Sequence, residues 1–306
     1  MDSPRLPRFK RVTVVGPIEL TDRDRHILRL VHRHRFLRSS HLTALIGGSA
    51  QPLLRRLQFL FHHGFLERPR AQLEYFHRTG TRPMVYGLGS KSGKLLKAQL
   101  GSSYRPYRWS EKNRAVGRMF LEHALLVSDV LVALELACHR SGRVRLYMDE
   151  VLTLPHKPSW KVTVDGNIRL GLVPDRVFAL ERVREDNSVD RAYFFLEADR
   201  GTMPVTRRSL VQTSFARKLL AYEATWSQGI HEKRFGFHRF RVLTITKSPE
   251  RVKSLVDACA QLKRGHGLFL FADQSVLQQP EILLAPVWQN GRGEMVSLLS
   301  TSAEGQ

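Results

Sequence analysis

Three acidic residues in the carboxyl-terminal half of the chain have the type and spacing needed to hold a metal ion. Asp175 follows a proline in the apolar run "VPDRVFAL", and Glu197 and Asp199 end the apolar run "FFLEADR". Side chains alternate across a strand, so Glu197 and Asp199 are expected on one face. If the strand that carries Asp175 pairs beside them, three carboxylates converge, and ionised carboxylates in contact repel unless a cation lies between them. This arrangement favours Mg²⁺ or Mn²⁺, which prefer oxygen ligands.

A lysine on the following helical segment adds a positive charge. In "FARKLLAYEATW" the apolar residues Phe215, Leu219, Tyr222 and Trp226 recur at helical spacing, and Lys218 lies on the same stripe. A lysine on an apolar face costs free energy unless an anion receives it. The carboxylates, or a phosphate that they hold, are the expected receiver. The candidate catalytic residues are therefore Asp175, Glu197, Asp199 and Lys218, and the candidate metal ligands are the three acids.

Each signal has a simpler interpretation when taken alone. A Pro-Asp pair is more often a turn than a metal site, and an acidic strand end is commonly solvated. Only their combination with Lys218 favours a site. The sequence contains no glycine-rich phosphate loop, so no ATP site is expected. Two cysteines, Cys138 and Cys259, are too few for a metal cluster or a disulfide framework, and we expect both to be buried and reduced.

The elements that must position these residues are predicted in the order α-β-β-β-α-β. A long helix covers "GRMFLEHALLVSDVLVALELACHRSG", and three strand-like segments follow, "VRLYMDEVL", "WKVTVDGNIRLGLVPDRVFALER" and "RAYFFLEADR". The helix with Lys218, the strand "FRVLTITK", the helix "SPERVKSLVDACAQLK" and the strand "GLFLFAD" complete the half. This order predicts a mixed sheet flanked by helices.

The amino-terminal part has the pattern of a winged helix-turn-helix. A helix capped by Thr21 is followed by a short helix that begins at Ser39 or Ser40 and by a third helix in "SAQPLLRRLQFLFHHGFLER". Two strands around a basic glycine-containing loop come next. In this arrangement the third helix enters the major groove of DNA and the wing contacts phosphates. The candidate DNA-binding residues are Arg55, Arg56, Gln58, Arg78 and Arg82, although a solvated helix face would explain each arginine equally well.

Charge is distributed unevenly along the chain. The 306 residues include 49 Lys and Arg against 28 Asp and Glu, a formal charge of +21. Residues 1–118 hold 24 of the basic and 7 of the acidic residues, and the rest hold 25 and 21. This asymmetry indicates a polyanion-binding module joined to a different one. The basic linker "SSYRPYRWSEKNRAVG" places the expected boundary near residue 110, giving domains 1–110 and 111–306. No apolar run is long enough to span a membrane, and we expect a cytoplasmic protein.

The motifs together resemble the PD-(D/E)xK nuclease-like superfamily and, over nearly the full length, the replication-relaxation family of plasmid and mobile-element proteins. The second resemblance rests on the winged-helix start, "EHALLVSDV", the Pro-Asp strand, "FLEADRGT", "KLLAY" and "FRVLTITKSPERVKSL". It implies a restriction-endonuclease-like αβββαβ domain with a mixed sheet after the winged helix. It also implies that Asp175 and Glu197 match the metal-binding acids and that Glu122 matches an extra acid. The common motif has lysine where this chain has Asp199, so Lys218 would supply that charge from the helix.

Two hypotheses of function follow. In the first, the protein processes plasmid or mobile-element DNA in replication, relaxation or mobilisation, as a nuclease or nickase that depends on Mg²⁺ or Mn²⁺. In the second, it is a non-catalytic DNA-binding regulator or replication accessory protein with a degenerate nuclease-like domain. The expected partners are double-stranded DNA, other replication or mobilisation proteins and a second copy of the chain.

Overall fold

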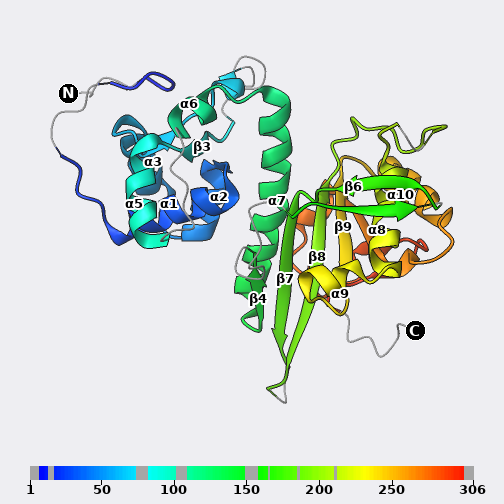
Figure 1. Ribbon diagram of the computed structural model, residues 1–306. Helices are drawn as coiled ribbons and strands as arrows, with labels where there is room; N and C mark the ends of the chain where they lie inside the picture. The colour runs from blue at the N-terminus through cyan, green and yellow to red at the C-terminus, as the bar shows by residue number, and fades with distance from the viewer. Residues whose placement is uncertain are drawn as a thin grey trace. The chain divides into compact units, whose positions relative to one another are not determined.

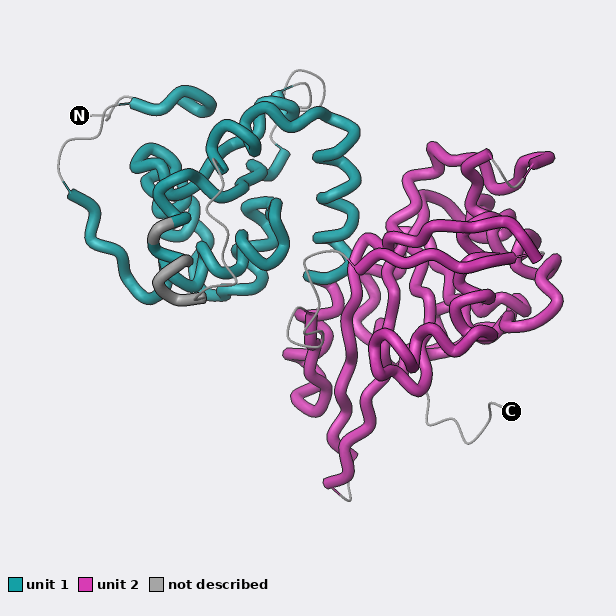
Figure 2. Tube along the Cα trace, viewed as in Figure 1, with its two compact units in different colours: residues 1–132 teal, residues 133–306 magenta. Residues whose placement is uncertain are grey.

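The computed structural model describes residues 7–12, 17–73, 82–100, 109–148, 158–164, 166–184, 187–209 and 212–299. The chain divides into two compact units, Met1–Val132 and Ala133–Gln306, shown in different colours in Figure 2. We refer to them as unit 1 and unit 2 and describe each by itself. The division falls inside the long helix α7 (Arg118–Ser141), which contributes residues to both units. Among the described residues, no helix has both the length and the apolar character that crossing a membrane requires.

Unit 1 begins with three helices, α1 (Asp22–His34), α2 (Ser39–Ile46) and α3 (Ala50–His62). The predicted cap of α1 is confirmed, because the Thr21 side chain accepts from the backbone N–H of Asp24 and the Asp24 carboxylate accepts from the backbone N–H of Thr21. The cap of α2 is Arg38 rather than Ser39 or Ser40, because Ser39 is already helical. The predicted third helix is α3, whose apolar residues Leu53, Leu57, Leu60 and Phe61 are buried, whereas Leu54 is 37% exposed.

A small antiparallel sheet completes the core of unit 1. Its strands are β1 (Leu37–Arg38), β2 (Leu66–Glu67) and β3 (Val85–Leu88), in the order β1-β3-β2. The short helix η1 (Arg70–Gln72) follows β2, and α5 (Ser90–Leu100) and α6 (Trp109–Arg114) follow β3. The principal helices and strands therefore follow one another in the order α1-β1-α2-α3-β2-β3 before the closing helices.

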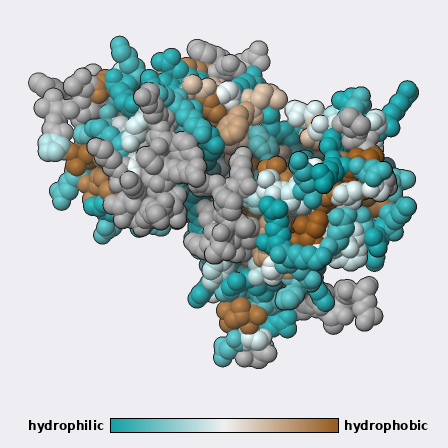
Figure 3. All heavy atoms as spheres, in the orientation of Figure 1, coloured by the Kyte–Doolittle hydropathy of each residue, from teal (hydrophilic) through white to brown (hydrophobic). Residues whose placement is uncertain are grey.

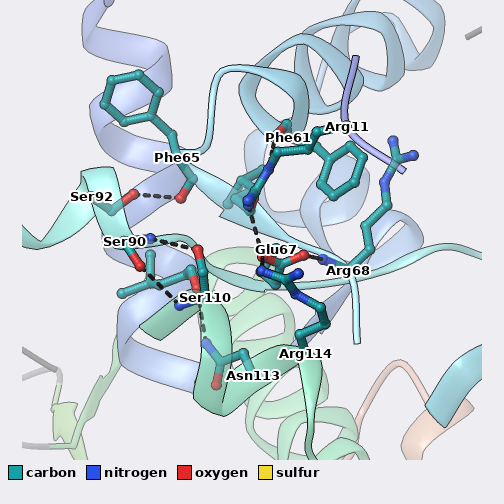
Figure 4. A network of polar contacts seen from close by, with 12 residues as sticks. Arg11, Phe61, Phe65, Glu67, Arg68, Ser90, Ser92, Ser110, Asn113 and Arg114 are labelled. Atoms are coloured by element: carbon teal, nitrogen blue, oxygen red, sulfur yellow. Dashed lines mark hydrogen bonds and ion pairs between the residues drawn. The ribbon is translucent and has the colours of Figure 1, made fainter. Parts of the chain in front are cut away.

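A polar network fixes the ends of β2 and β3 to the closing helices (Figure 4). Arg11, from the segment before α1, donates to the carbonyl oxygens of Phe61 and Leu66 and to the carboxylate of Glu67. Asn113 on α6 donates to the carbonyl oxygen of Leu88 over 2.9 Å. Because Glu67 is only 4% exposed, its ion pair with Arg11 ties the start of the chain to the base of the sheet.

Unit 2 is built on a seven-stranded mixed sheet in the order β12-β11-β10-β9-β8-β7-β4 (Figure 1). The strands β8, β9 and β10 are parallel to one another, and the remaining neighbours are antiparallel. The bounds of the strands are β4 (Val144–Tyr147), β7 (Arg176–Val183), β8 (Val189–Ala198), β9 (Arg241–Thr246), β10 (Phe269–Asp273), β11 (Trp288–Asn290) and β12 (Met295–Val296). The helices are α8 (Phe215–Ser227), α9 (Ile230–Phe235) and α10 (Pro249–Ala260), with the short turns η4 (His266–Leu268) and η5 (Gln274–Gln278). The mixed sheet predicted from the sequence is thus present.

One strand-like segment is divided differently from the prediction. The run from Trp160 to Arg182 forms a separate hairpin, β5 (Trp160–Val164) and β6 (Ile168–Leu172), before β7 begins. Gly166 at φ +77° makes the tight turn between β5 and β6, and Pro174 interrupts the chain before β7. The hairpin shares one hydrophobic cluster with α8, α10 and the sheet, and the Trp160 indole donates to Thr225 on α8 over 2.8 Å.

Candidate functional site

Strand register places one acid of the predicted site directly opposite another. Arg176 pairs with Leu196, and the backbone N–H of Asp175 donates to the carbonyl oxygen of Leu196 over 3.0 Å. Asp175 therefore lies beside Glu197, and the predicted pairing of their strands is confirmed. On the other side Glu197 pairs with Thr244 of β9. These three residues form a row across β7, β8 and β9 on one face of the sheet.

Glu197 is the most enclosed of the predicted acids. Its exposed fraction is 1%, and both carboxylate oxygens are occupied. Lys218 Nζ donates to Oε2 over 2.5 Å, and the Tyr222 hydroxyl donates to Oε1 over 2.6 Å. Burial raises the pKa of Glu197, against the attraction of Lys218, and the neighbouring Asp175 raises it further. Glu197 is thus a carboxylate whose charge is incompletely compensated.

The helix α8 supplies the donors to Glu197. It begins at the N-cap Ser214, whose side chain accepts from the backbone N–H of Arg217. Burial would lower the pKa of Lys218, but attraction to Glu197 raises it above the ordinary value, so the ammonium stays charged. Burial raises the pKa of Tyr222 well above its ordinary value, which keeps the hydroxyl protonated as a donor. The predicted apolar stripe of α8 is confirmed except for Trp226, which is 39% exposed.

Asp175 and Asp199 have different partners. Asp175 Oδ2 accepts from the backbone N–H of Ala198 over 2.8 Å. Asp199 Oδ2 accepts from Thr246 over 2.9 Å and from Arg251 Nε over 2.8 Å, and a second Arg251 nitrogen lies 3.3 Å from Oδ1. The strand ends at Ala198, and Arg251 on α10 then provides a forked partner that neutralises Asp199.

The expected convergence of three carboxylates is therefore not what the structure shows. Over the part of the chain that the structure describes, no group of three or more His, Cys, Asp or Glu side chains is placed to hold a metal ion. Two carboxylates, Asp175 and Glu197, remain side by side. Thr244, which pairs with Glu197 across β8 and β9, is 0% exposed, and its hydroxyl has no hydrogen-bond partner among the described residues. Two acids and one unsatisfied hydroxyl fit a hard divalent cation, which commonly takes only one or two carboxylates from the protein.

We define the Glu197 site as five residues: Asp175, Glu197, Lys218, Tyr222 and Thr244. Glu122, the further candidate ligand, lies in unit 1, where it accepts from Arg118 on the same helix over 2.8 Å. Sequence reasoning did not single out Thr244, Thr246 or Arg251. The polar residues Thr244 and Thr246 alternate within the otherwise apolar strand "RVLTIT", and this alternation was the available signal.

The predicted DNA-binding residues of unit 1 have distinct surroundings. Arg55 on α3 is exposed, and Gln58 is half-buried. Arg56 was expected to face outward, but its guanidinium contacts the buried carboxylate of Asp24 and the carbonyl oxygen of Glu19. Arg78 lies outside the described residues, and Arg82 is exposed. Arg82 borders an open groove whose other lining residues are Ser39, Ser40, Thr43, Ala44, Leu54, Pro83 and Met84.

On the face shown in Figure 3, hydrophilic residues surround small apolar patches. The exposed large apolar residues of α3 are Leu54 and Phe59, at 37% and 36%. Isolated apolar residues of this kind are ordinary on a protein surface. Neither residue therefore indicates an apolar docking surface.

Comparison with known proteins identifies a family that covers most of the chain. The replication-relaxation family matches residues 28–239, which is more than half of the chain. No curated protein and no solved structure matches significantly. The matched range includes Asp175, Glu197 and Lys218 and ends before Thr244 and Arg251. With this extent of agreement, the chain belongs to the replication-relaxation family.

Proposed function

We propose that this protein processes the DNA of a plasmid or mobile element, with unit 1 binding duplex DNA and unit 2 hydrolysing a phosphodiester bond. The observation that carries the proposal is the Glu197 site, in which Asp175 and Glu197 lie opposite each other and Lys218 reaches them from α8. Membership of the replication-relaxation family supports a role connected with replication or relaxation. Carboxylates beside a lysine are suited to a divalent cation and a phosphate.

The element order of unit 1 supports a winged-helix domain. The order α1-β1-α2-α3-β2-β3 and the three-stranded sheet are those of a winged helix, in which α3 is the recognition helix. Arg55 is exposed on α3, and Arg82 is exposed just before β3. A surplus of basic residues in this part of the chain favours a polyanionic ligand. We propose that domain 1–110 binds DNA and that domain 111–306 carries the nuclease-like site.

The core of unit 2 supports a nuclease-like fold. If the β5–β6 hairpin and the short helix α9 are treated as insertions, the order α7-β4-β7-β8-α8-β9 matches αβββαβ. The strands β4, β7, β8 and β9 are also consecutive neighbours in the sheet. The Pro-Asp pair therefore precedes the second core strand, and Glu197 is near the end of the third.

The residues of the Glu197 site have separable roles in this proposal. Asp175 and Glu197 would hold Mg²⁺ or Mn²⁺, which when bound would supply an activated water and polarise the phosphate. Lys218 would leave Glu197 and direct its ammonium toward a phosphate oxygen, where it stabilises developing negative charge. Tyr222 would keep its bond to the second oxygen of Glu197 and so hold the carboxylate in place. Arg251 fixes Asp199 and the segment after β8 and is not expected to touch substrate.

A second candidate function is supported by one feature of the same site. Both oxygens of Glu197 are already bonded to Lys218 and Tyr222, and Asp199 occupies the position of the common lysine. A site closed by its own lysine is what a degenerate nuclease-like domain would retain. In that case the protein is a DNA-binding regulator or replication accessory protein without cleavage activity.

A plasmid assay separates the two candidates. Wild-type protein with Mg²⁺ or Mn²⁺ is expected to convert supercoiled plasmid to nicked or linear DNA. Asp175→Asn and Glu197→Gln should reduce the rate by on the order of a hundredfold or more, because each removes a charge that holds the cation. The matched control is Asp190→Asn, an exposed acid of β8 paired with Arg184. Equal rates in all four proteins would exclude the Glu197 site, and binding without cleavage would favour the regulator.

DNA binding by unit 1 has its own test. Arg55→Ala should weaken duplex binding by up to about tenfold and reduce the slope of log affinity against log salt by about one. Arg140→Ala, on the part of α7 within unit 2, is the control and should change neither quantity. Equal binding by the two variants would contradict the assignment of α3 as the recognition helix.

A further inference from the structure

A run of positive charge without any negative charge follows the end of β8. Residues 200–218 contain five basic residues and no acidic residue. Residues 119–306 hold 25 basic and 21 acidic residues, a net surplus of four, so the five positive charges of this run exceed the surplus of the whole region. The basic residues are Arg200, Arg207, Arg208, Arg217 and Lys218. Such a concentration indicates an anionic ligand.

The run lies where ligands approach a parallel sheet. It connects the carboxyl end of β8 to the start of α8, and β8, β9 and β10 are parallel and therefore end at the same edge (Figure 1). We call residues 200–214 the β8–α8 loop; residues 210 and 211 are outside the description. Lys247 follows β9 at this edge, and its side chain lies against Gly201. The cations of the loop are therefore at the same edge as the Glu197 site.

The first part of the loop is fixed by hydrogen bonds. Arg251 donates to the carbonyl oxygen of Met203 over 2.5 Å, and Gly201 N–H donates to Asp199 over 3.1 Å. The N–H groups of Phe215 and Ala216, in the first turn of α8, donate to the carbonyl oxygens of Pro204 and Val205. These donors of the helix terminus are already used. An anion at this position must therefore be held by side chains.

Arg207 and Arg208 are the side chains available for this role. Both are exposed, and only Thr206 separates them from the fixed residues Pro204 and Val205. Guanidinium groups bind phosphate oxygens through paired N–H donors, and two adjacent arginines can engage successive phosphates. Lys247, which is also exposed, adds a third cation at the same edge.

We infer that the β8–α8 loop binds the phosphodiester backbone of DNA through Arg207 and Arg208, with Lys247 beside them. This inference rests on the proposed function in taking DNA as the polyanion. It gives unit 2 a DNA contact of its own, in addition to the one proposed for unit 1. Because the contact is made to phosphates, it is independent of base sequence. Its role is to hold the backbone at the edge of the sheet where Glu197 and Lys218 lie.

The test uses the full chain and one pair of matched double variants. Arg207→Gln with Arg208→Gln removes two charges at the carboxyl edge. Lys233→Gln with Arg239→Gln removes two exposed charges near the amino end of β9, at the opposite edge. Duplex affinity is measured over a range of salt concentrations. We expect the first variant to reduce the salt slope by about two and the affinity at low salt by on the order of tenfold, and the second to change neither.

Each outcome decides the inference. The inference is overturned if the Arg207 and Arg208 variant has the same salt slope as the wild type. It is also overturned if both double variants lose the same affinity, or if the wild type does not bind DNA at low salt. Thermal unfolding checks that the variants remain folded. A reduced slope in a protein that never cuts plasmid would support the loop contact and reject the nuclease. If the wild type cuts plasmid but the Arg207 and Arg208 variant has an unchanged salt slope, the nuclease is supported and the loop contact is rejected.

Discussion

Two buried carboxylates, one in each unit, have opposite electrostatic character. Asp24 in unit 1 and Glu197 in unit 2 have exposed fractions of 0% and 1%. Burial raises the pKa of Asp24, but the hydrogen bonds from Arg56 and Thr21 together lower it by more. The pKa of Asp24 is therefore below its ordinary value. Burial and Asp175 raise the pKa of Glu197 in spite of Lys218. A buried acid alone therefore does not indicate a functional site.

The difference lies in the donors around each acid. Asp24 receives the forked guanidinium of Arg56 and both the N–H and the hydroxyl of Thr21, at the positive end of α1. Glu197 receives one ammonium and one phenol and lies beside another acid. Asp24 is satisfied by its own unit, whereas the Glu197 site would gain from a cation.

The largest expected effect is on the stability of unit 1. Asp24→Ala should lower the free energy of unfolding by about 3–5 kcal/mol, because it leaves Arg56 without its partner and removes the capping box of α1. Asp22→Ala is the matched control, since Asp22 is in the same first turn and fully exposed, and it should have little effect. Urea unfolding measures both. If both variants lower the free energy of unfolding by the same amount, burial of Asp24 with Arg56 does not distinguish it from the exposed Asp22.

The next largest effect is the stabilisation of the protein by a cation bound at the Glu197 site. Mn²⁺ at a hundred times its dissociation constant should stabilise the wild type by about 2.7 kcal/mol, measured as a rise in the unfolding temperature. Asp175→Asn should abolish the rise. Lys218→Met should increase the affinity for Mn²⁺, because it removes the charge that competes for Glu197. If Asp175→Asn shows the same rise as the wild type, the two carboxylates are only a polar strand end.

The two acids should also respond to pH in opposite directions. The pKa of Asp24 in the folded protein is below its ordinary value of 3.8, so its contribution to stability is present above that pH and is lost as pH falls through the folded pKa. The pKa of Glu197 in the folded protein is above its ordinary value of 4.5, so its contribution is present below that pH and is lost as pH rises through the folded pKa. Urea unfolding of wild type, Asp24→Asn and Glu197→Gln from acidic to neutral pH measures both trends. Parallel trends would contradict the comparison.

The smallest effect concerns the hydroxyl groups of β9. Thr244→Val removes a buried hydroxyl without a described partner and should stabilise the protein by up to about 1 kcal/mol while weakening Mn²⁺ binding. Thr246→Val removes the hydroxyl that donates to Asp199 and should destabilise by about 1 kcal/mol. Thermal unfolding with and without Mn²⁺ compares them. A loss of stability in both variants would show that Thr244 is satisfied within the protein.

Local patterns in the sequence predicted most of the fold. The cap at Thr21, the apolar stripe of α8 and the pairing of the Asp175 and Glu197 strands all depend on periodicity or on short-range hydrogen bonds. The partners that neutralise an acid come from distant elements. Arg56 lies 32 residues from Asp24, and Arg251 lies 52 residues from Asp199. Sequence spacing alone could not show that Arg56 faces inward or that Thr246 and Arg251 bind Asp199.

The register of the Glu197 site has a consequence for the order of folding. Asp175 lies just before β7 and Glu197 lies on β8, and the two strands form an antiparallel pair, whereas Lys218 and Thr244 come from the crossover through α8 to β9. Pairing of β7 with β8 can extend from Val183 and Val189, which are close in sequence, so each further pair closes a small loop and loses little chain entropy. We therefore expect the acids to meet before the crossover brings Lys218 and Thr244 to them. Screening of their repulsion by Mn²⁺ should then accelerate refolding, which stopped-flow measurements can detect. The same two charges that are proposed to hold a cation in the native protein would set a kinetic barrier while the chain folds.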